Sequence, residues 1–136
     1  MLMPLRGVTA LTLVLACLVA GCGATDRDSD AAASVERFQA GLEARDGAAA
    51  SAELSEETTD ALEEQESKPC EEAIFALELP RGARVASTHV DVTSASVTLA
   101  AGGTLFLDEG PDGWQIAAAG CRPVTPSLPL DCELED

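Results

Sequence analysis

Hydrophobic positions divide the chain into a continuous apolar run near its start, a middle part with helical spacing and a last part in which apolar and polar residues alternate. In the middle part, Val35, Phe38 and Leu42 recur at i, i+3 and i+7. This spacing is typical of one buried face of a helix. Asp30 is a suitable cap for its start, and Gly47 suits the left-handed residue that ends many helices. We therefore expect the first helix between these two residues.

Two or three short helices are expected to follow the first one. Leu54, Ala61 and Leu62 provide apolar contacts in an otherwise acidic segment, and Ser55 can cap a helix there. Pro69 suits the first turn of another short helix.

The last part of the chain alternates with a period of two, which is typical of strands. The apolar faces of the first two runs are Ala86, Thr88, Val90 and Val92, then Ala95, Val97 and Leu99. Glycine, proline and aspartate in segments 100–103 and 108–113 separate the runs. We expect a meander of about four antiparallel strands, with the helices packed on its apolar face. The predicted fold class is therefore α+β.

The apolar run at the start has the layout of a secretory signal peptide. It follows Arg6, extends from Val8 to Val19, and is shorter than the roughly 20 residues that a membrane-spanning helix needs. It ends in Val-Ala-Gly-Cys, which resembles the lipobox of bacterial lipoproteins. We expect cleavage after residue 21, a lipid on Cys22 and a location on the outer face of the cytoplasmic membrane, in the cell envelope. An ordinary signal peptide followed by a chance cysteine is the alternative.

The charge of the mature chain limits its partners. Residues 1–21 contain Arg6 and no acid, so 7 basic and 24 acidic residues remain, with a formal net charge of −17. Such a chain repels nucleic acid and anionic headgroups, so the lipid must hold it to the membrane. Residues 22–30 are small, polar and charged, which predicts a flexible tether after the lipidated cysteine. Residues 31–136 then suit one small domain.

The order of elements and several motifs resemble a group of small actinobacterial lipoproteins, uncharacterised in function, that are similar to the NTF2-like superfamily. The motifs are VERFQAGLEARDGAAASAELSEET, PCEEAI, GGTLFLDEGPDGWQIAAAGC and the closing DC. The resemblance implies helices packed in the concave side of a curved sheet, and a pocket there in many relatives. Members of the group often carry a cysteine where this chain has Ser51. NTF2-like isomerases use a pocket carboxylate with tyrosine donors, whereas this chain has no tyrosine, so the resemblance implies the fold and not that chemistry.

The acidic residues between positions 53 and 72 do not have the spacing of a calcium-binding loop, and carboxylates on helix faces are usually solvated. The acidic turn at 108–113 likewise suits a hairpin better than a calcium site. We therefore expect no metal and no cofactor.

His89, the only histidine, lies on a predicted strand with Ser87 and Asp91 on the same side. Side chains two apart on one strand are about 6–7 Å apart, which is too far for a direct hydrogen bond between nucleophile and base. We expect His89 and Asp91 on the solvent face and without a catalytic role. Trp114 follows Gly113 at a strand start and is expected in the core. These three residues are the weak candidates for a pocket or site.

Cysteine pairing follows from export and from spacing. An oxidising compartment favours disulfides, and lipid on Cys22 leaves three cysteines in the mature chain. Cys121 ends the last predicted strand, and the proline-rich loop after it can fold back to Cys132, so we expect these two to pair. Cys70 is then the unpaired residue. The resemblance implies that its natural partner is the cysteine replaced by Ser51, so we expect a buried free thiol, with a Cys70 bridge as the alternative.

No candidate set of residues indicates a reaction, so we do not expect an enzyme. The first hypothesis is a lipid-anchored domain that binds a small ligand or an envelope protein. An NTF2-like enzyme of isomerase or hydrolase type with an unrecognised site is the second. A structural component of the envelope is the third.

Overall fold

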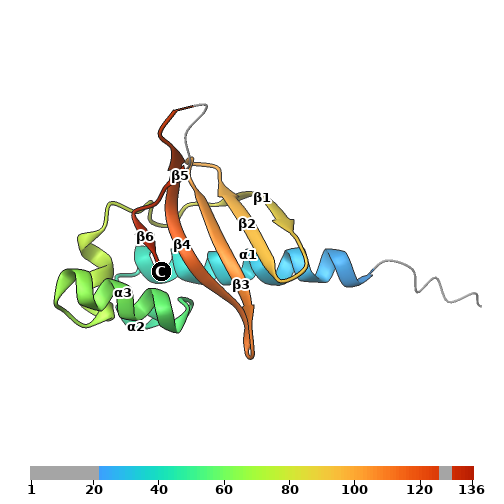
Figure 1. The fold of residues 1–136 in the computed structure, drawn as a ribbon. Coiled ribbons are helices and arrows are strands. Elements are labelled where there is room, and N and C mark those ends of the chain that lie inside the picture. Colours follow the sequence, from blue (N-terminus) through green and yellow to red (C-terminus); the bar gives the residue numbers. More distant parts are fainter. Residues whose placement is uncertain (1–21, 126–129) are drawn as a thin grey trace, which may run out of the picture.

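The computed structural model describes residues 22–125 and 130–136, so the expected signal peptide of residues 1–21 lies outside the described residues. Helices come first and a curved antiparallel sheet follows, which confirms the α+β class (Figure 1). The helical elements are α1 (Cys22–Glu43), α2 (Gly47–Ser51), α3 (Glu56–Glu66), α4 (Cys70–Ala73) and the 3-10 helix η1 (Ile74–Ala76). The strands are β1 (Val85–Val90), β2 (Ser94–Leu99), β3 (Thr104–Gly110), β4 (Gly113–Pro123), β5 (Leu130–Asp131) and β6 (Leu134–Glu135).

Helix α1 buries the apolar stripe that its sequence predicts. Val35 and Phe38 are fully buried, and Leu42 is 1% exposed. This stripe lies against one face of the sheet, where α1 contacts β1, β2 and β4. In Figure 1 the helix passes behind the strands, so the sheet has an inner face toward α1 and an outer face toward the viewer.

The start of α1 corrects one prediction. Residues 22–30 were expected to form a flexible tether, but they belong to the helix, which begins at Cys22. Arg27 provides the reason: its Nη2 donates to the backbone oxygen of Val92 at 2.6 Å and to the carboxylate of Glu109 at 2.9 Å. Its guanidinium carbon also lies 5.4 Å from the centre of the Trp114 ring. These long-range contacts stabilise a helical turn whose composition alone does not favour it.

The end of α1 corrects a second prediction. The helix ends at Glu43, and Arg45, with a φ of 53°, adopts the left-handed conformation expected at Gly47. Gly47 instead begins α2. A Cβ atom at this position would collide with the backbone carbonyl of Glu71, so the glycine allows α2 to lie directly against α4.

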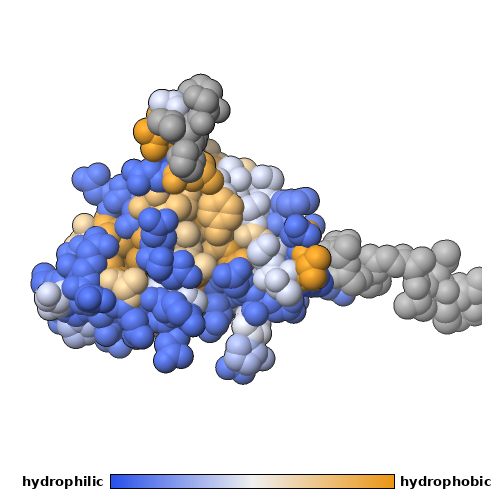
Figure 2. Space-filling model, viewed as in Figure 1, coloured by the Kyte–Doolittle hydropathy of each residue, from blue (hydrophilic) through white to orange (hydrophobic). Residues whose placement is uncertain are grey.

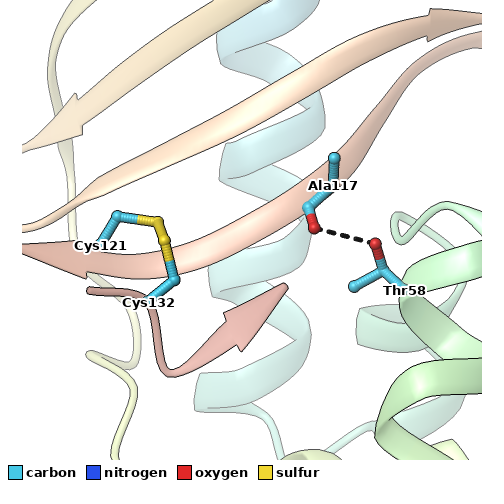
Figure 3. The surroundings of a disulfide bond; sticks show 4 residues. All are labelled: Thr58, Ala117, Cys121 and Cys132. Atoms are coloured by element: carbon cyan, nitrogen blue, oxygen red, sulfur yellow. Dashed lines mark hydrogen bonds between the residues drawn. A yellow bond between two sulfur atoms is a disulfide. The ribbon is translucent and has the colours of Figure 1, made fainter. Parts of the chain in front are cut away.

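Helix α3 is capped and tied to the sheet. The Ser55 hydroxyl accepts a hydrogen bond from the backbone N–H of Thr58 at 3.1 Å, which confirms the predicted cap. The Thr58 hydroxyl donates to the backbone oxygen of Ala117 in β4 at 2.9 Å (Figure 3). The backbone N–H of Ser55 donates to the carbonyl of Ile116 at 2.9 Å. These bonds hold the start of α3 beside β4.

The sheet is a meander in the order β1-β2-β3-β4-β5, and β6 also pairs with β4. The expected four strands correspond to β1 through β4. The tail adds the other two: β5 pairs at Arg122 and Pro123, and β6 pairs at Ala118 and Ala119. Two-residue strands after a proline-rich loop have too little periodicity to be recognised in a sequence.

The inner face of β2 is the predicted one, because Ala95, Val97 and Leu99 are all buried. The predicted face of β1 is partly wrong. The register shifts between Val85 and Ser87, so Ala86 is exposed, and Val92 lies in the turn after the strand with 77% of its surface exposed. An irregularity of this kind moves a side chain to the other face of a sheet.

Candidate functional site

A pocket of about 350 Å³ lies between the middle of α1 and the inner face of the sheet. Four buried apolar side chains form its floor: Phe38, Leu99, Leu105 and Ala119. The segment after η1 borders it through Glu78, Leu79 and Pro80, and the turn between β2 and β3 borders it through Gly102 and Gly103. Arg122 and Glu133 complete the rim, together with Gly120. A hollow with an apolar floor and a few polar groups is the usual form of a small-molecule site.

Small residues keep this pocket open. Gly102 and Gly103, with φ values of 93° and 89°, form a turn that brings no side chain over the mouth. Gly120 has a φ of 68°, and a Cβ atom there would lie 2.8 Å from Leu79 and 2.9 Å from Glu133. The glycine therefore lets the segments that carry Leu79 and Glu133 close in on β4 and form the wall.

Gln39 is the buried polar side chain of this pocket, with an exposed fraction of 3%. Its side-chain Oε1 accepts a hydrogen bond from the backbone N–H of Ala83 at 3.0 Å. The backbone carbonyl of Gln39 accepts another from the backbone N–H of Gly82 at 3.2 Å. These bonds fix the amide orientation and leave its Nε2 without a hydrogen-bond partner among the residues that the structure describes. No fully buried side-chain nitrogen or oxygen of the described part lacks a partner, so this Nε2 reaches an accessible surface. Gln39 also borders a shallow groove beside Ala83 and Val85, so its Nε2 is available as a donor at the boundary of the two hollows.

Charged groups surround only the mouth. Glu78, Arg122 and Glu133 are exposed. The ion pairs that the structure records, Arg27 with Glu109 and Arg37 with Glu53, do not involve them. A ligand that enters this pocket therefore meets polar, solvated groups at the rim and apolar groups below.

A second hollow, of about 460 Å³, lies between the first half of α1 and the hairpin of β3 and β4. Arg37 donates to both carboxylate oxygens of Glu53, at 2.7 and 3.1 Å. This hydrogen bonding, the largest contribution, raises the pKa of Arg37 above its ordinary value. The fully buried Ser34 hydroxyl lies 2.9 Å from Glu53 Oε2 and 3.1 Å from the backbone oxygen of Trp114. These bonds join α1 to the hairpin through Trp114 and to the segment between α2 and α3 through Glu53.

The three weak candidates from the sequence do not come together, and none lines the first pocket. Trp114 is 8% exposed and belongs to the core, as expected, beside the second hollow. His89 and Asp91 are exposed and border a shallow groove on the outer face with Phe106. Asp91 accepts a hydrogen bond from the backbone N–H of Val92 at 2.8 Å, which stabilises its own turn.

Figure 2 shows apolar colours gathered over β3 and β4 on the outer face, within a mostly hydrophilic surface. Phe106 and Ala118 are paired across these two strands. This apolar area lies on the opposite side of the sheet from the pocket floor, so the two are separate features.

The cysteines are arranged as expected. Cys121 and Cys132 form a disulfide that ties the tail to β4 (Figure 3). Cys70 is a free cysteine with an exposed fraction of 3%. The Ser51 hydroxyl lies 3.0 Å from its sulfur and donates to it. The Ser51 side chain therefore contacts the free thiol directly.

The Cys70 thiol is expected to resist alkylation in the folded protein at neutral pH. Burial, the largest contribution, raises the pKa of this thiol above its usual value, so little reactive thiolate forms. The protonated Cys70 thiol makes its full contribution to the free energy of unfolding at pH values below the pKa of the unfolded thiol. This contribution is lost as the pH rises through the higher pKa of the folded thiol. Iodoacetamide should therefore modify Cys70 slowly before denaturation and fast after it. The variant Cys70→Ala should lose less stability at alkaline pH than the parent, and rapid native labelling would contradict this account.

Comparison with known proteins leaves the family open, because no protein-family model, curated protein or solved structure matches this chain. Across residues 22–125 and 130–136, no helix is long and apolar enough to cross a membrane. Within the same part, no group of three or more His, Cys, Asp or Glu side chains is arranged to hold a metal ion.

Proposed function

We propose that this protein is a lipid-anchored extracytoplasmic lipoprotein whose single folded domain binds a small molecule with both polar and apolar groups in the pocket between α1 and the sheet. The observation that carries the proposal is the pocket itself, which has buried apolar side chains beneath it and charged side chains around its mouth. A position between helices and the inner face of a curved sheet also agrees with the resemblance to NTF2-like lipoproteins. The lipobox-like sequence that ends at Cys22 supports the anchor.

The composition of the pocket favours binding over catalysis. Among the described residues, its floor carries no side chain that titrates near neutral pH. The polar group within it, Gln39, can donate a hydrogen bond but cannot transfer a proton. The ligand we propose therefore has polar groups that face Glu78, Arg122 and Glu133 at the rim and an apolar part that faces the buried side chains below. An enzyme of NTF2-like type would need a proton-transferring group from the rim.

The pocket is tested by titration with the neutral apolar dye phenylnaphthylamine, whose fluorescence rises in apolar surroundings. The parent for this experiment is the mature chain with Cys22→Ala. Ala119 lies on the pocket floor, whereas the adjacent Ala118 pairs with Phe106 on the outer face. We expect Ala119→Leu to weaken dye binding by about tenfold or more, which is at least ~1.4 kcal/mol.

The matched control is Ala118→Leu, which adds the same atoms on the opposite side of the same strand. It should leave the affinity unchanged, and circular dichroism should confirm that both variants are folded. Equal effects of the two substitutions, or no saturable binding by the parent, would refute a binding pocket on the inner face.

The anchor is tested separately with Cys22→Ala in the full chain. The thiol of this residue is the proposed lipid attachment point, and two acyl chains hold a protein stably on a bilayer where one is marginal. We expect the variant to be released from membranes or to stay unprocessed, while the parent sediments with them. An unchanged membrane fraction and unchanged electrophoretic mobility would contradict the lipoprotein assignment.

A further inference from the structure

The helix that begins at the proposed lipid attachment point is part of the folded domain. Helix α1 is 22 residues long and continuous from Cys22 to Glu43. At a rise of about 1.5 Å per residue, Arg27 lies about 8 Å along the helix from Cys22. Arg27 bonds to Val92 in the turn between β1 and β2 and to Glu109 near the end of β3. The first turns of α1 are therefore fixed to the domain.

The pocket lies much farther along the same helix. Phe38 and Gln39 line it, and the same rise per residue places them about 24 Å from Cys22. The turns at the two ends of β2 are separated in the same direction as Cys22 and the pocket. The turn that holds Val92 contacts the start of α1 through Arg27, whereas the turn that holds Gly102 borders the pocket. These turns are about 20 Å apart across the six residues of β2.

Charge opposes a helix that lies flat on the bilayer. The solvent side of α1 carries Asp26, Asp30, Glu36 and Glu43, against Arg37, whose charge is paired with Glu53. The mature chain as a whole has a formal net charge of −17. Anionic headgroups repel such a surface over about a Debye length, so the rest of the domain is favoured at a distance from the membrane.

We infer that the lipoprotein stands on the membrane with the turn between β1 and β2 next to the bilayer and the pocket held away from it, so that the pocket takes its ligand from the aqueous phase. This inference rests on the proposed lipid anchor at Cys22. It also narrows the proposed function, because a pocket in this position does not extract lipid from the bilayer beneath it. The ligand class is a water-borne small molecule that carries both polar and apolar groups.

The orientation is tested with the full lipidated protein in vesicles of phosphatidylethanolamine and phosphatidylglycerol that contain a lipid with a nitroxide on its headgroup. The background variant is Cys70→Ala, and a fluorophore is attached to Val92→Cys or to Ala101→Cys. Val92 and Ala101 are both exposed and lie in the turns at opposite ends of β2. We expect several-fold stronger quenching for the label at position 92 than for the label at position 101.

The helix is tested by Ser29→Pro combined with Arg27→Ala, which together break α1 and remove the bonds from its first turns to Val92 and Glu109. This variant should remain on the vesicles while the difference between the two labels becomes small. Vesicle-bound protein with equal quenching at both positions, or with stronger quenching at position 101, would refute the orientation and leave the anchor standing. A large difference that survives the double substitution would refute the role of the helix. Protein that does not bind the vesicles at all would refute the anchor and, with it, this inference.

Discussion

Alanine in place of Phe38 is expected to lower the free energy of unfolding by about 3–5 kcal/mol. Phe38 belongs to α1, and its side chain is fully buried against the inner face of the sheet, next to the pocket. Its removal deletes apolar contacts and leaves a space that the neighbouring side chains do not fill. Urea denaturation of the mature chain with Cys22→Ala, with and without the substitution, measures the loss.

Phe75→Ala is the matched control for this prediction. Phe75 is half-buried at the edge of the core, with the guanidinium groups of Arg45 and Arg81 at 5.8 and 5.4 Å from its ring centre. The same change at this position should cost clearly less, because the ring already contacts solvent. A loss at Phe38 no larger than the loss at Phe75 would contradict the packing of α1 on the sheet.

Cysteine in place of Ser51 is expected to raise the free energy of unfolding by about 3 kcal/mol under oxidising conditions. The Ser51 hydroxyl already lies 3.0 Å from the Cys70 sulfur, so two thiols at these positions are close enough to join. The new disulfide would close a loop of about 20 residues and restrict the unfolded chain. The measurement is urea denaturation with and without reductant, together with a count of free thiols.

Ser51→Ala is the control, because it removes the contact with Cys70 and adds no bond. It should give no stabilisation in either condition. A Ser51→Cys protein that keeps its free thiols after oxidation would contradict the placement of α2 against α4.

Much of the fold could be predicted from hydrophobic periodicity. The stripe of Val35, Phe38 and Leu42 and the alternation in β2 both bury the residues that the patterns indicate. Periodicity reports which face of an element is apolar, and a single helix or strand carries that information locally. The cap at Ser55 and the pairing of Cys121 with Cys132 were predictable for a similar reason, since each depends on residues close in the sequence.

Features that depend on distant residues could not be predicted in this way. The helical start of α1 depends on bonds from Arg27 to Val92 and Glu109, 65 and 82 positions away. The irregularity in β1 depends on how that strand pairs with β2. In both cases tertiary contacts decide between conformations that the local sequence leaves nearly equal.

The residues that line the pocket had no signal in the sequence. Its lining comes from separate stretches around residues 38, 79, 102, 120 and 133, and most of it is apolar or glycine. The sequence drew attention to His89 and Asp91 because titratable residues suggest chemistry, yet these lie on the outer side of the sheet. A binding site made of small and apolar residues becomes visible only when the elements are assembled.

The position of a bound probe tests the proposed binding function most directly. In the mature chain with Cys22→Ala, saturated with phenylnaphthylamine, intermolecular nuclear Overhauser effects report which side chains lie next to the dye. The account predicts contacts from the dye to the methyl groups of Leu99 and Leu105 and to the ring of Phe38, which form the pocket floor. Contacts confined to the outer face around Phe106, or a dye without contacts to the protein, would contradict it.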